Sequence, residues 1–402
     1  MRNMLDSAMI EGATADAVEA RLRSTLDSIA SFTIGAEEEY ILVDPTTLLP
    51  IPRSGEALWS CHGDRRVAAE LLQCQIEGIA PISVAVADVV RELRSVRRLL
   101  DSRLAGVARL VAVGAHPTAT DPGPITEAPR YAQIALSHPL AARRMLVGGL
   151  HVHVAVGGAD RALAVFNALR SYLPFIAAVA ANAPFHEGED SGMASVRPTL
   201  LRHLPRTGTP PAFRSLSEYA EFLVWSRGVG AQDATHHWWD LRIHPSTGTI
   251  EVRVADVPTH VEDTGAIVAL TQSLIFRLAE RYDSGEMLEC HATERIEENA
   301  RLAARDGVGG LLANLDDGSS VATADAVLSL VEALTPSALA LGCLDELSGI
   351  ERLAREGGGA TRQRLVAESG GIDELVRWLA EQTTGRRSGA GFAEPELVAQ
   401  TG

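Results

Sequence analysis

The chain has 402 residues, of which 46 % are hydrophobic, so it can build the core of one large domain or of two smaller ones. Its 52 acidic and 36 basic residues give a net charge of −16, which argues against a general nucleic-acid or anionic-membrane binder. Every basic residue is an arginine, and the absence of lysine excludes a Walker-A ATPase, a pyridoxal phosphate enzyme and a protein kinase, each of which needs a lysine.

The N-terminal segment, residues 1–31, has apolar residues at helical spacing and is predicted to form a helical extension. Charges throughout this segment leave no apolar region for a secretory signal, so we expect a cytoplasmic protein. The four cysteines are scattered without metal-ligand spacing, which fits reduced thiols in that compartment. The most apolar run, residues 173–185, is too short to span a bilayer, so no membrane segment is expected.

Three consecutive carboxylates mark the first predicted strand, residues 32–44, with the sequence FTIGAEEEYILVD. Because side chains alternate across a strand, Glu37 and Glu39 share one face, whereas Glu38 points to the other face and is expected to find an arginine partner. Two carboxylates roughly 7 Å apart on one face repel each other unless a cation lies between them, and a divalent cation prefers such oxygen ligands. A solvated edge strand explains this segment alone equally well.

Two more carboxylates, Glu70 and Glu77, stand among the apolar residues of the segment 68–79. Residues 83–110 follow, with apolar residues at helical spacing and arginines on the opposite face, which predicts a helix. A short apolar strand and a Pro-rich polar loop are predicted next, at residues 110–115 and 116–130.

A second strand with ionisable side chains is predicted at residues 148–157, with the sequence GGLHVHVAVG. His151 and His153 share one face of this strand, and the opposite face is unbroken and apolar. A single buried histidine is more often a core residue than a ligand, but two on one face indicate a site.

A long apolar helix at residues 162–183 and an irregular loop at residues 184–211 are predicted after this strand. Loops of such length are usually functional or disordered, which makes Arg197 a candidate anion contact. A further helix is predicted at residues 215–227.

The third region with ionisable strands is residues 237–256, predicted to form two strands joined by a turn. Thr249, Glu251 and Arg253 share one face of the second strand, opposite three apolar residues. Beyond this region the chain is predicted to be mostly helical, at residues 265–282, 294–314, 322–334 and 372–383, and to end in a flexible tail at 384–402.

Three strands with one apolar and one ionisable face predict an antiparallel sheet that helices cover on one side and that lines an active site with the other. Gathering Glu37, Glu39, Glu77 and Glu251 in one cleft requires cations, because unpaired buried charges cost several kcal/mol each. Carboxylate-rich sites suit two or three Mg²⁺ or Mn²⁺ ions shared with nucleotide phosphates. Zinc is disfavoured, because no cysteine cluster completes a tetrahedral site.

Five motifs, GAEEEYILVD, ELLQCQIE, GGLHVHVAVG, WWDLRIHP and TGTIEVRVAD, resemble in order and spacing the glutamate–cysteine ligase type 2 family of carboxylate–amine ligases, within the wider glutamine synthetase superfamily. The resemblance implies an α+β fold in which a curved antiparallel sheet is flanked by helices. The resemblance covers residues 32–383, and because no break in composition marks a second domain, we expect one ligase domain there with a helical subregion at about 294–383. The implied reaction uses ATP to activate the γ-carboxylate of glutamate as an acyl phosphate, which an amine such as that of cysteine then attacks.

The resemblance also implies roles for particular residues. The implied metal ligands are Glu37, Glu39, Glu77, Glu251 and His151, with Glu70 as a weaker candidate. His151 and His153 would contact the nucleotide, Arg253 would act with Glu251 in catalysis by stabilising the transferring phosphoryl group, and Arg197 and Arg242 would contact carboxylate or phosphate. The implied partners are small molecules, with no nucleic acid and no membrane, and a homo-oligomer is left open.

Two segments depart from the family pattern. The family commonly has WxGRDTG where this chain has HEGEDSG, with His186 and Glu189 in place of an aromatic residue and an arginine, and ENxWRAxR where this chain has ENARLAAR. Both changes are expected to affect substrate preference, so the amine is left open. Two alternatives to a ligase also stay open: a metal-dependent amide or phosphoester hydrolase that needs no ATP, and a non-catalytic binding protein of the same fold.

Overall fold

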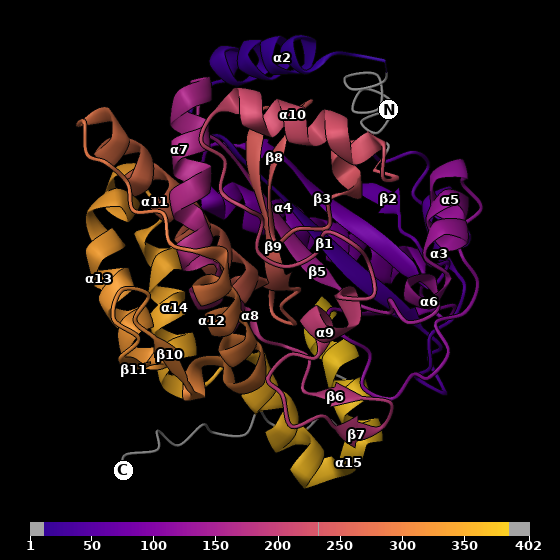
Figure 1. Ribbon diagram of the computed structural model, residues 1–402. Helices are drawn as coiled ribbons and strands as arrows, with labels where there is room; N and C mark the ends of the chain where they lie inside the picture. The colour runs from indigo at the N-terminus through magenta and orange to yellow at the C-terminus, as the bar shows by residue number, and fades with distance from the viewer. Residues whose placement is uncertain (1–11, 232, 386–402) are drawn as a thin grey trace.

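The computed structural model describes residues 12–231 and 233–385, and the fold is a mixed sheet-and-helix structure (Figure 1). The predictions for residues 1–11 and for the tail beyond residue 385 lie outside the described residues. The main sheet has seven strands, and their order is β2-β3-β1-β5-β9-β8 with β4 beside the end of β1. The strands of this sheet are β1 (Ile34–Val43), β2 (Val67–Ala69), β3 (Gln75–Ser83), β4 (Arg109–Val111), β5 (Gly149–Ala155), β8 (Leu241–His244) and β9 (Thr249–Asp256).

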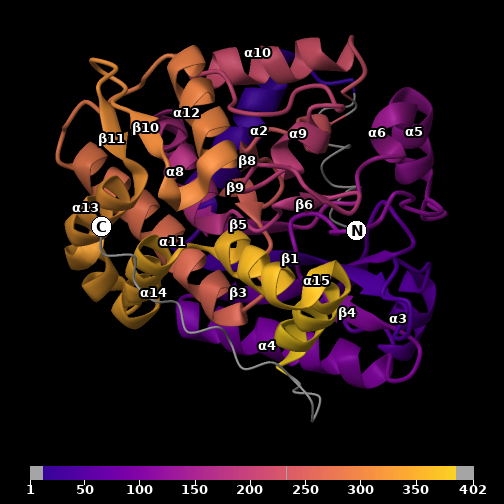
Figure 2. The same ribbon diagram turned by 90° about the horizontal axis from the view of Figure 1, so that it is seen from below.

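Helices surround this sheet, most densely on one side (Figures 1 and 2). The helices of the N-terminal half are α2 (Ala15–Ser28), α3 (Ser54–Ser60), α4 (Val86–Arg103), α5 (Pro129–Ser137), α6 (Pro139–Ala142), α7 (Ala159–Leu169) and α8 (Leu173–Ala180). The helices of the C-terminal half are α9 (Arg197–Leu201), α10 (Leu216–Arg227), α11 (Val261–Asp283), α12 (Thr293–Asp306), α13 (Thr323–Leu341), α14 (Leu344–Glu356) and α15 (Gly359–Thr384).

The apolar face of the sheet supplies the main core. Ile34 and Ala36 of β1 are buried with Val152 and Val154 of β5, and they pack in one cluster with apolar residues of α4, α7 and α11. Since side chains alternate along each strand, burying this face turns Glu37, Glu39 and the two histidines of β5 to the opposite face. The predicted antiparallel sheet with one helix-covered face and one ionisable face is therefore confirmed.

Glu38 is on the helix-covered face and is fully buried, as its position in the strand predicted. Arg97 of α4 donates two hydrogen bonds to its carboxylate, at 2.9 Å from Nε and 2.7 Å from Nη2. Tyr40 and Thr264 also donate their hydroxyl groups to this carboxylate, each at 2.5 Å. The expected arginine partner is confirmed, and the pair joins β1 to α4 and α11 behind the site.

Several predicted elements differ from the observed ones because glycine or proline interrupts them. The helix predicted at 294–314 is wrong beyond Asp306: Gly307 has a φ of +58°, and a hairpin of β10 (Leu311–Ala313) and β11 (Ser320–Ala322) follows. The helix predicted at 162–183 is two helices, because Pro174 begins a new one, α8.

Other predictions were wrong because helices and strands were predicted as loops or were not predicted at all. The predicted loop at 116–130 is irregular only as far as residue 128, because α5 begins at Pro129, and the sequence did not predict α5 or α6. The predicted loop at 184–211 contains α9 and a small hairpin of β6 (Phe185–His186) and β7 (Glu189–Asp190). β4 ends at Val111, short of the predicted strand end, and α14 was missed.

Two helical stretches have the length and composition of a membrane span, Ala159–Ala180 and Thr323–Leu341. In the first, 72 % of the most apolar window is buried inside this protein, which is typical of a core helix, whereas 28 % of the second is buried. Length and composition alone are therefore weak evidence for a membrane segment here.

Candidate active site

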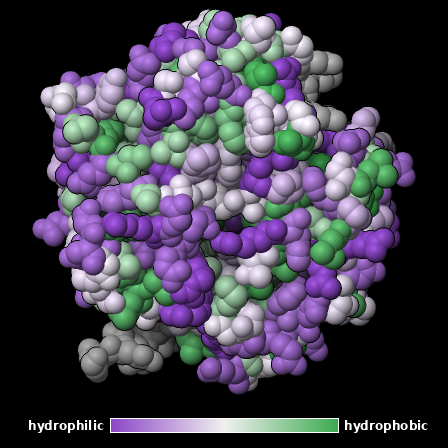
Figure 3. All heavy atoms as spheres, in the orientation of Figure 1, coloured by the Kyte–Doolittle hydropathy of each residue, from purple (hydrophilic) through white to green (hydrophobic). Residues whose placement is uncertain are grey.

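The ionisable face of the sheet forms the floor of a cavity of about 320 Å³. In the space-filling view this side of the molecule is hollowed near its centre, with hydrophilic residues beside the opening (Figure 3). All ten residues predicted for the site line this one cavity: Glu37, Glu39, Glu70, Glu77, His151, His153, Arg197, Arg242, Glu251 and Arg253.

Strand register explains why residues far apart in the sequence meet there. Glu39 of β1 is directly opposite Glu77 of β3, and Glu37 is opposite His151 of β5. On the other edge of β5, His153 is opposite Glu251, which in turn is opposite Arg242 of β8. Directly opposed side chains on one face of a sheet are about 5 Å apart, so the register alone builds a continuous row of ionisable groups.

Glu37 belongs to both of the groups that have the geometry of a metal site among the described residues. It groups with His153 and Glu251 on one side and with Glu77 and His151 on the other, and within each group one donor atom per residue lies within 4.8 Å of the others. A carboxylate shared by two such groups can bridge two cations. Glu39 lies outside both groups and instead accepts a hydrogen bond from the Gly149 amide at 2.6 Å.

His153 supports the fit to a cation. Its Nδ1 bonds to the Thr249 hydroxyl at 3.0 Å, which fixes the ring, while its buried Nε2 has no hydrogen-bond partner among the described residues. Oε2 of Glu37 and Oε1 of Glu251 lie 3.7 and 3.9 Å from Nε2, too far for hydrogen bonds. Donors bound about 2.1 Å from one metal ion are roughly 3–4 Å from each other, so these three atoms have the spacing of a ligand set.

The protonation states also suit metal binding. Burial alone would raise the pKa of Glu37, but His153 and His151 outweigh it and hold that pKa well below the usual range, so the carboxylate is ionised. Burial, and then the charge of Arg253, lowers the pKa of His151, which keeps its ring neutral. An ionised carboxylate and a neutral imidazole are the forms that bind a metal ion. Burial and the neighbouring Glu39 raise the pKa of Glu70 to about 8.

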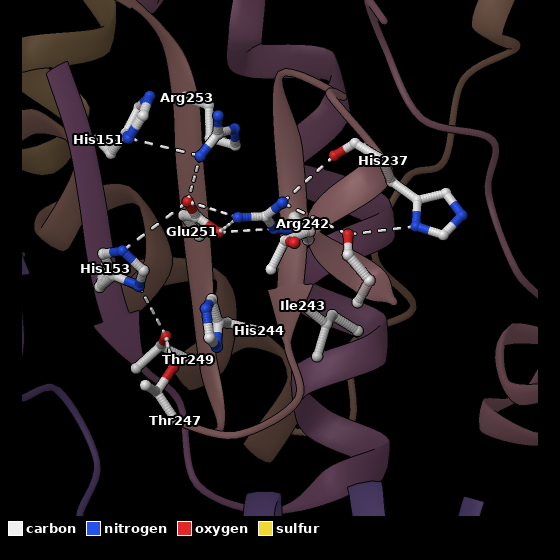
Figure 4. Close-up of polar contacts among 12 residues, drawn as sticks. His151, His153, His237, Arg242, Ile243, His244, Thr247, Thr249, Glu251 and Arg253 are labelled. Atoms are coloured by element: carbon white, nitrogen blue, oxygen red, sulfur yellow. Dashed lines mark hydrogen bonds and ion pairs between the residues drawn. The ribbon is translucent and has the colours of Figure 1, made fainter. Parts of the chain in front are cut away.

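Two arginines bind the carboxylate of Glu251 (Figure 4). Arg242 binds it with both arms of its guanidinium, at 2.8 Å from Nε to Oε2 and 3.0 Å from Nη2 to Oε1. Arg253 donates to the same Oε1 at 2.5 Å and lies 3.4 Å from His151 Nδ1. Burial would raise the pKa of Glu251, but Arg242 and then Arg253 outweigh it and keep the group ionised. Arg242 was predicted to contact a carboxylate or phosphate of the bound molecules, but its guanidinium instead binds Glu251 of the protein.

Arg197 approaches the sheet at a glycine. Its Nη1 and Nη2 donate to the backbone carbonyls of Val254 and Arg253, at 3.3 and 3.2 Å. A Cβ on Gly149 would lie 2.4 Å from Nη2 of Arg197 and 3.2 Å from Oε2 of Glu39, so only glycine leaves room for both side chains. Gly149 therefore makes room for two side chains of the site, a role that the sequence motif did not reveal.

Sequence reasoning missed several residues that line the same cavity. They come from elements that it read as loops or did not assign to the site: Arg130, Tyr131, Ile134, Met145, Trp238, Asp240 and His244. Burial and the charge of Glu297 raise the pKa of Asp240 to about 6. Conversely, no residue of the two departing segments, HEGEDSG and ENARLAAR, lines the cavity.

Comparison with known proteins assigns the family. The model of glutamate–cysteine ligase family 2 matches residues 33–381, nearly the whole described chain. The chain belongs to this family. A Rubrobacter xylanophilus protein named among the type 2 glutamate–cysteine ligases is 38 % identical over 362 residues, which are 88 % of this chain and 97 % of that protein. A Mycolicibacterium smegmatis protein of the same naming is 34 % identical over 86 % of this chain and 93 % of its own length.

Solved structures support the fold of this family member. Glutamate–cysteine ligase from Francisella tularensis, in complex with AMP, aligns with a TM-score of 0.64 and 11 % identity over 90 % of this chain and 91 % of its own. A bifunctional glutathione synthetase from Pasteurella multocida aligns with the same TM-score and 14 % identity, covering 91 % of this chain and 54 % of that one. The predicted family and fold class, and the predicted ATP-dependent carboxylate–amine ligase as the class of enzyme, are confirmed.

Proposed function

We propose that this ligase activates the γ-carboxylate of glutamate as an acyl phosphate and joins it to the amine of a second amino acid such as cysteine. The observation that carries the proposal is Glu37, which two groups of carboxylate and imidazole donors share at the centre of the cavity floor. Two cations held in this way would stabilise both the attacking and the leaving oxygen of a phosphoryl transfer. Because two-metal sites also occur in hydrolases, the family match is what favours a ligase here.

Glu37, Glu77 and His151 would hold one Mg²⁺ or Mn²⁺ ion, and Glu37, His153 and Glu251 a second. A third ion would have to use Glu39 and Glu70, the other two carboxylates predicted as ligands, which line the same cavity. Carboxylates favour Mg²⁺ or Mn²⁺, and the two histidines move the preference toward Mn²⁺. When bound, such ions neutralise the phosphate oxygens and polarise the bond that breaks.

The first step is the attack of a γ-carboxylate oxygen on the terminal phosphorus of ATP, with release of ADP. Arg253 would bind an oxygen of the phosphoryl group as it moves, and it is held in place by Glu251. In the second step the amine attacks the acyl carbon, the C–O bond to phosphate breaks, and the amine loses a proton as the amide forms. Arg242 keeps Glu251 ionised and fixed throughout both steps.

The proposal includes the setting of the reaction. The substrates would be small molecules in the cytoplasm, with no nucleic acid or membrane partner, and residues 32–383 would act as one ligase domain. The net charge of −16 agrees with this setting.

Phosphate release tests the proposed function. With ATP, Mg²⁺ or Mn²⁺, glutamate and a panel of amino acids and amines, we expect phosphate release only when acid and amine are both present, and loss of release when EDTA removes the metal. Omitting glutamate tests the acid, and omitting the amine tests the second step. Turnover of amides or phosphoesters without ATP would instead support a hydrolase.

A further inference from the structure

One arginine of the cavity forms no hydrogen bond or ion pair with the described residues. Four arginines line the cavity, namely Arg130, Arg197, Arg242 and Arg253. The last three are engaged, since Arg242 and Arg253 bind Glu251 and Arg197 donates to carbonyls of β9. Among the described residues, Arg130 forms neither a hydrogen bond nor an ion pair, and its Nε is fully buried.

The fold fixes Arg130 without using its guanidinium. The next residue, Tyr131, donates its hydroxyl to the carbonyl of Ala69 at 2.8 Å, which ties α5 to the edge strand β2. One turn further along α5, Ile134 is buried in a cluster with Leu71 and Leu72. A buried donor without a partner costs free energy, so Arg130, which packing holds in this position, is available to a ligand that enters the cavity.

The surroundings of Arg130 indicate which ligand. Ile134 shares its helix face, since it is four residues further along α5, and both line the cavity. At the end of the helix, His138 contacts the ring of Trp238, another lining residue, with centroids 5.7 Å apart. Glu70 also lines this cavity, and the charge of Arg130 opposes the rise in the pKa of Glu70, but the two side chains form no hydrogen bond or ion pair. A guanidinium in a cavity that also has apolar side chains suits the carboxylate of an amino acid, whose carbon stem is apolar, better than a polyphosphate that needs metal ions around it.

We propose that Arg130 binds a carboxylate of the amino-acid substrates that does not react, either the α-carboxylate of the acid or the carboxylate of the amine. It is a specificity residue, and it makes the enzyme select amino acids over simple acids and amines. This inference rests on the proposed function for the identity of the substrates. Arg130 lies on α5 and is not a member of the two metal groups, whose residues come from strands of the sheet.

Substrate analogues that lack one carboxylate test this role. For Arg130→Met we expect the KM of either glutamate or cysteine to rise roughly 10- to 100-fold, the range for losing one charged hydrogen-bonding partner, with little change in kcat. The KM of the matching decarboxylated compound, 4-aminobutyrate or cysteamine, should not change. Arg130→Lys should restore part of the loss, because it keeps the charge but not the fork. Arg144→Met, at an exposed arginine outside the cavity, is the matched control.

Three results would overturn the inference: equal losses for a substrate and its decarboxylated analogue, a rise confined to the KM of ATP, or no change. The second would make Arg130 a phosphate contact instead. Calorimetric binding of glutamate and of cysteine to wild type and Arg130→Met needs no turnover. A wild-type protein that ligates nothing but binds one amino acid through Arg130 would therefore refute the proposed function and retain the inference, whereas Arg130-independent binding would refute the inference alone.

Discussion

Replacing Glu37 with glutamine is expected to lower the rate of ATP-dependent ligation by at least about 10³-fold, equivalent to about 4 kcal/mol of transition-state stabilisation. Glutamine has nearly the same shape, but it lacks the charge that both donor groups share. One substitution therefore weakens both proposed cation sites at once, which no other carboxylate of the cavity would do. Steady-state phosphate release measures the loss.

The loss of activity in Glu37→Gln implicates the site only if this variant is still folded. We expect Mn²⁺ to raise the melting temperature of the wild type and to have much less effect on Glu37→Gln, while the far-ultraviolet circular dichroism of the two proteins agrees. Glu56→Gln, at a half-exposed carboxylate of α3 outside the cavity, should behave as the wild type. A Glu37→Gln variant with near-normal turnover and an unchanged metal response would remove Glu37 from the site.

Replacing Arg97 with methionine is expected to lower the free energy of unfolding by about 3–5 kcal/mol, the range for breaking a buried ion pair from one side. Only 2 % of the Arg97 side chain and none of the Glu38 side chain is exposed, so the remaining carboxylate would be left without compensation. Arg97 also donates to the carbonyls of Pro258 and Thr259, at 2.9 and 2.6 Å, which join β9 to α11. Urea denaturation measures the change.

The double variant Glu38→Gln with Arg97→Met separates charge from packing. If the buried charge causes the loss, adding Glu38→Gln to Arg97→Met should recover part of it, because the carboxylate is no longer stranded. Arg91→Met, at an exposed arginine of the same helix, should change stability by less than about 0.5 kcal/mol. A double variant less stable than the single one would show that packing, and not charge, dominates this contact.

Strand periodicity explains why so much of the site could be predicted from the sequence. Successive side chains of a strand point to opposite faces, so the position of each residue in its strand decides its face. This rule alone predicted that Glu37, Glu39, the two histidines and Glu251 lie on ionisable faces. The same alternation placed Glu38 on the buried face, where Arg97 meets it. The spacing of the motifs then indicated the family, which the family match confirms.

What could not be predicted depends on contacts between distant segments. The opposition of Arg242 and Glu251 follows from the register of β8 and β9, which no single strand reveals. Arg130 stood at the end of a segment interpreted as a loop, because the short helix α5 has few signals of its own and is held by packing against β2 and its neighbours. The need for glycine at residue 149 appears only when Arg197 reaches it from α9.

The fate of a γ-oxygen of glutamate distinguishes an acyl phosphate from other intermediates. If the γ-carboxylate is activated as an acyl phosphate, glutamate carrying ¹⁸O in both γ-oxygens should transfer one labelled atom to inorganic phosphate in each turnover and keep the other in the amide product. Mass spectrometry of both products with ATP, Mn²⁺ and the preferred amine measures this. Phosphate without label, or label recovered in AMP, would contradict the acyl phosphate and with it the proposed role of the Glu37 site.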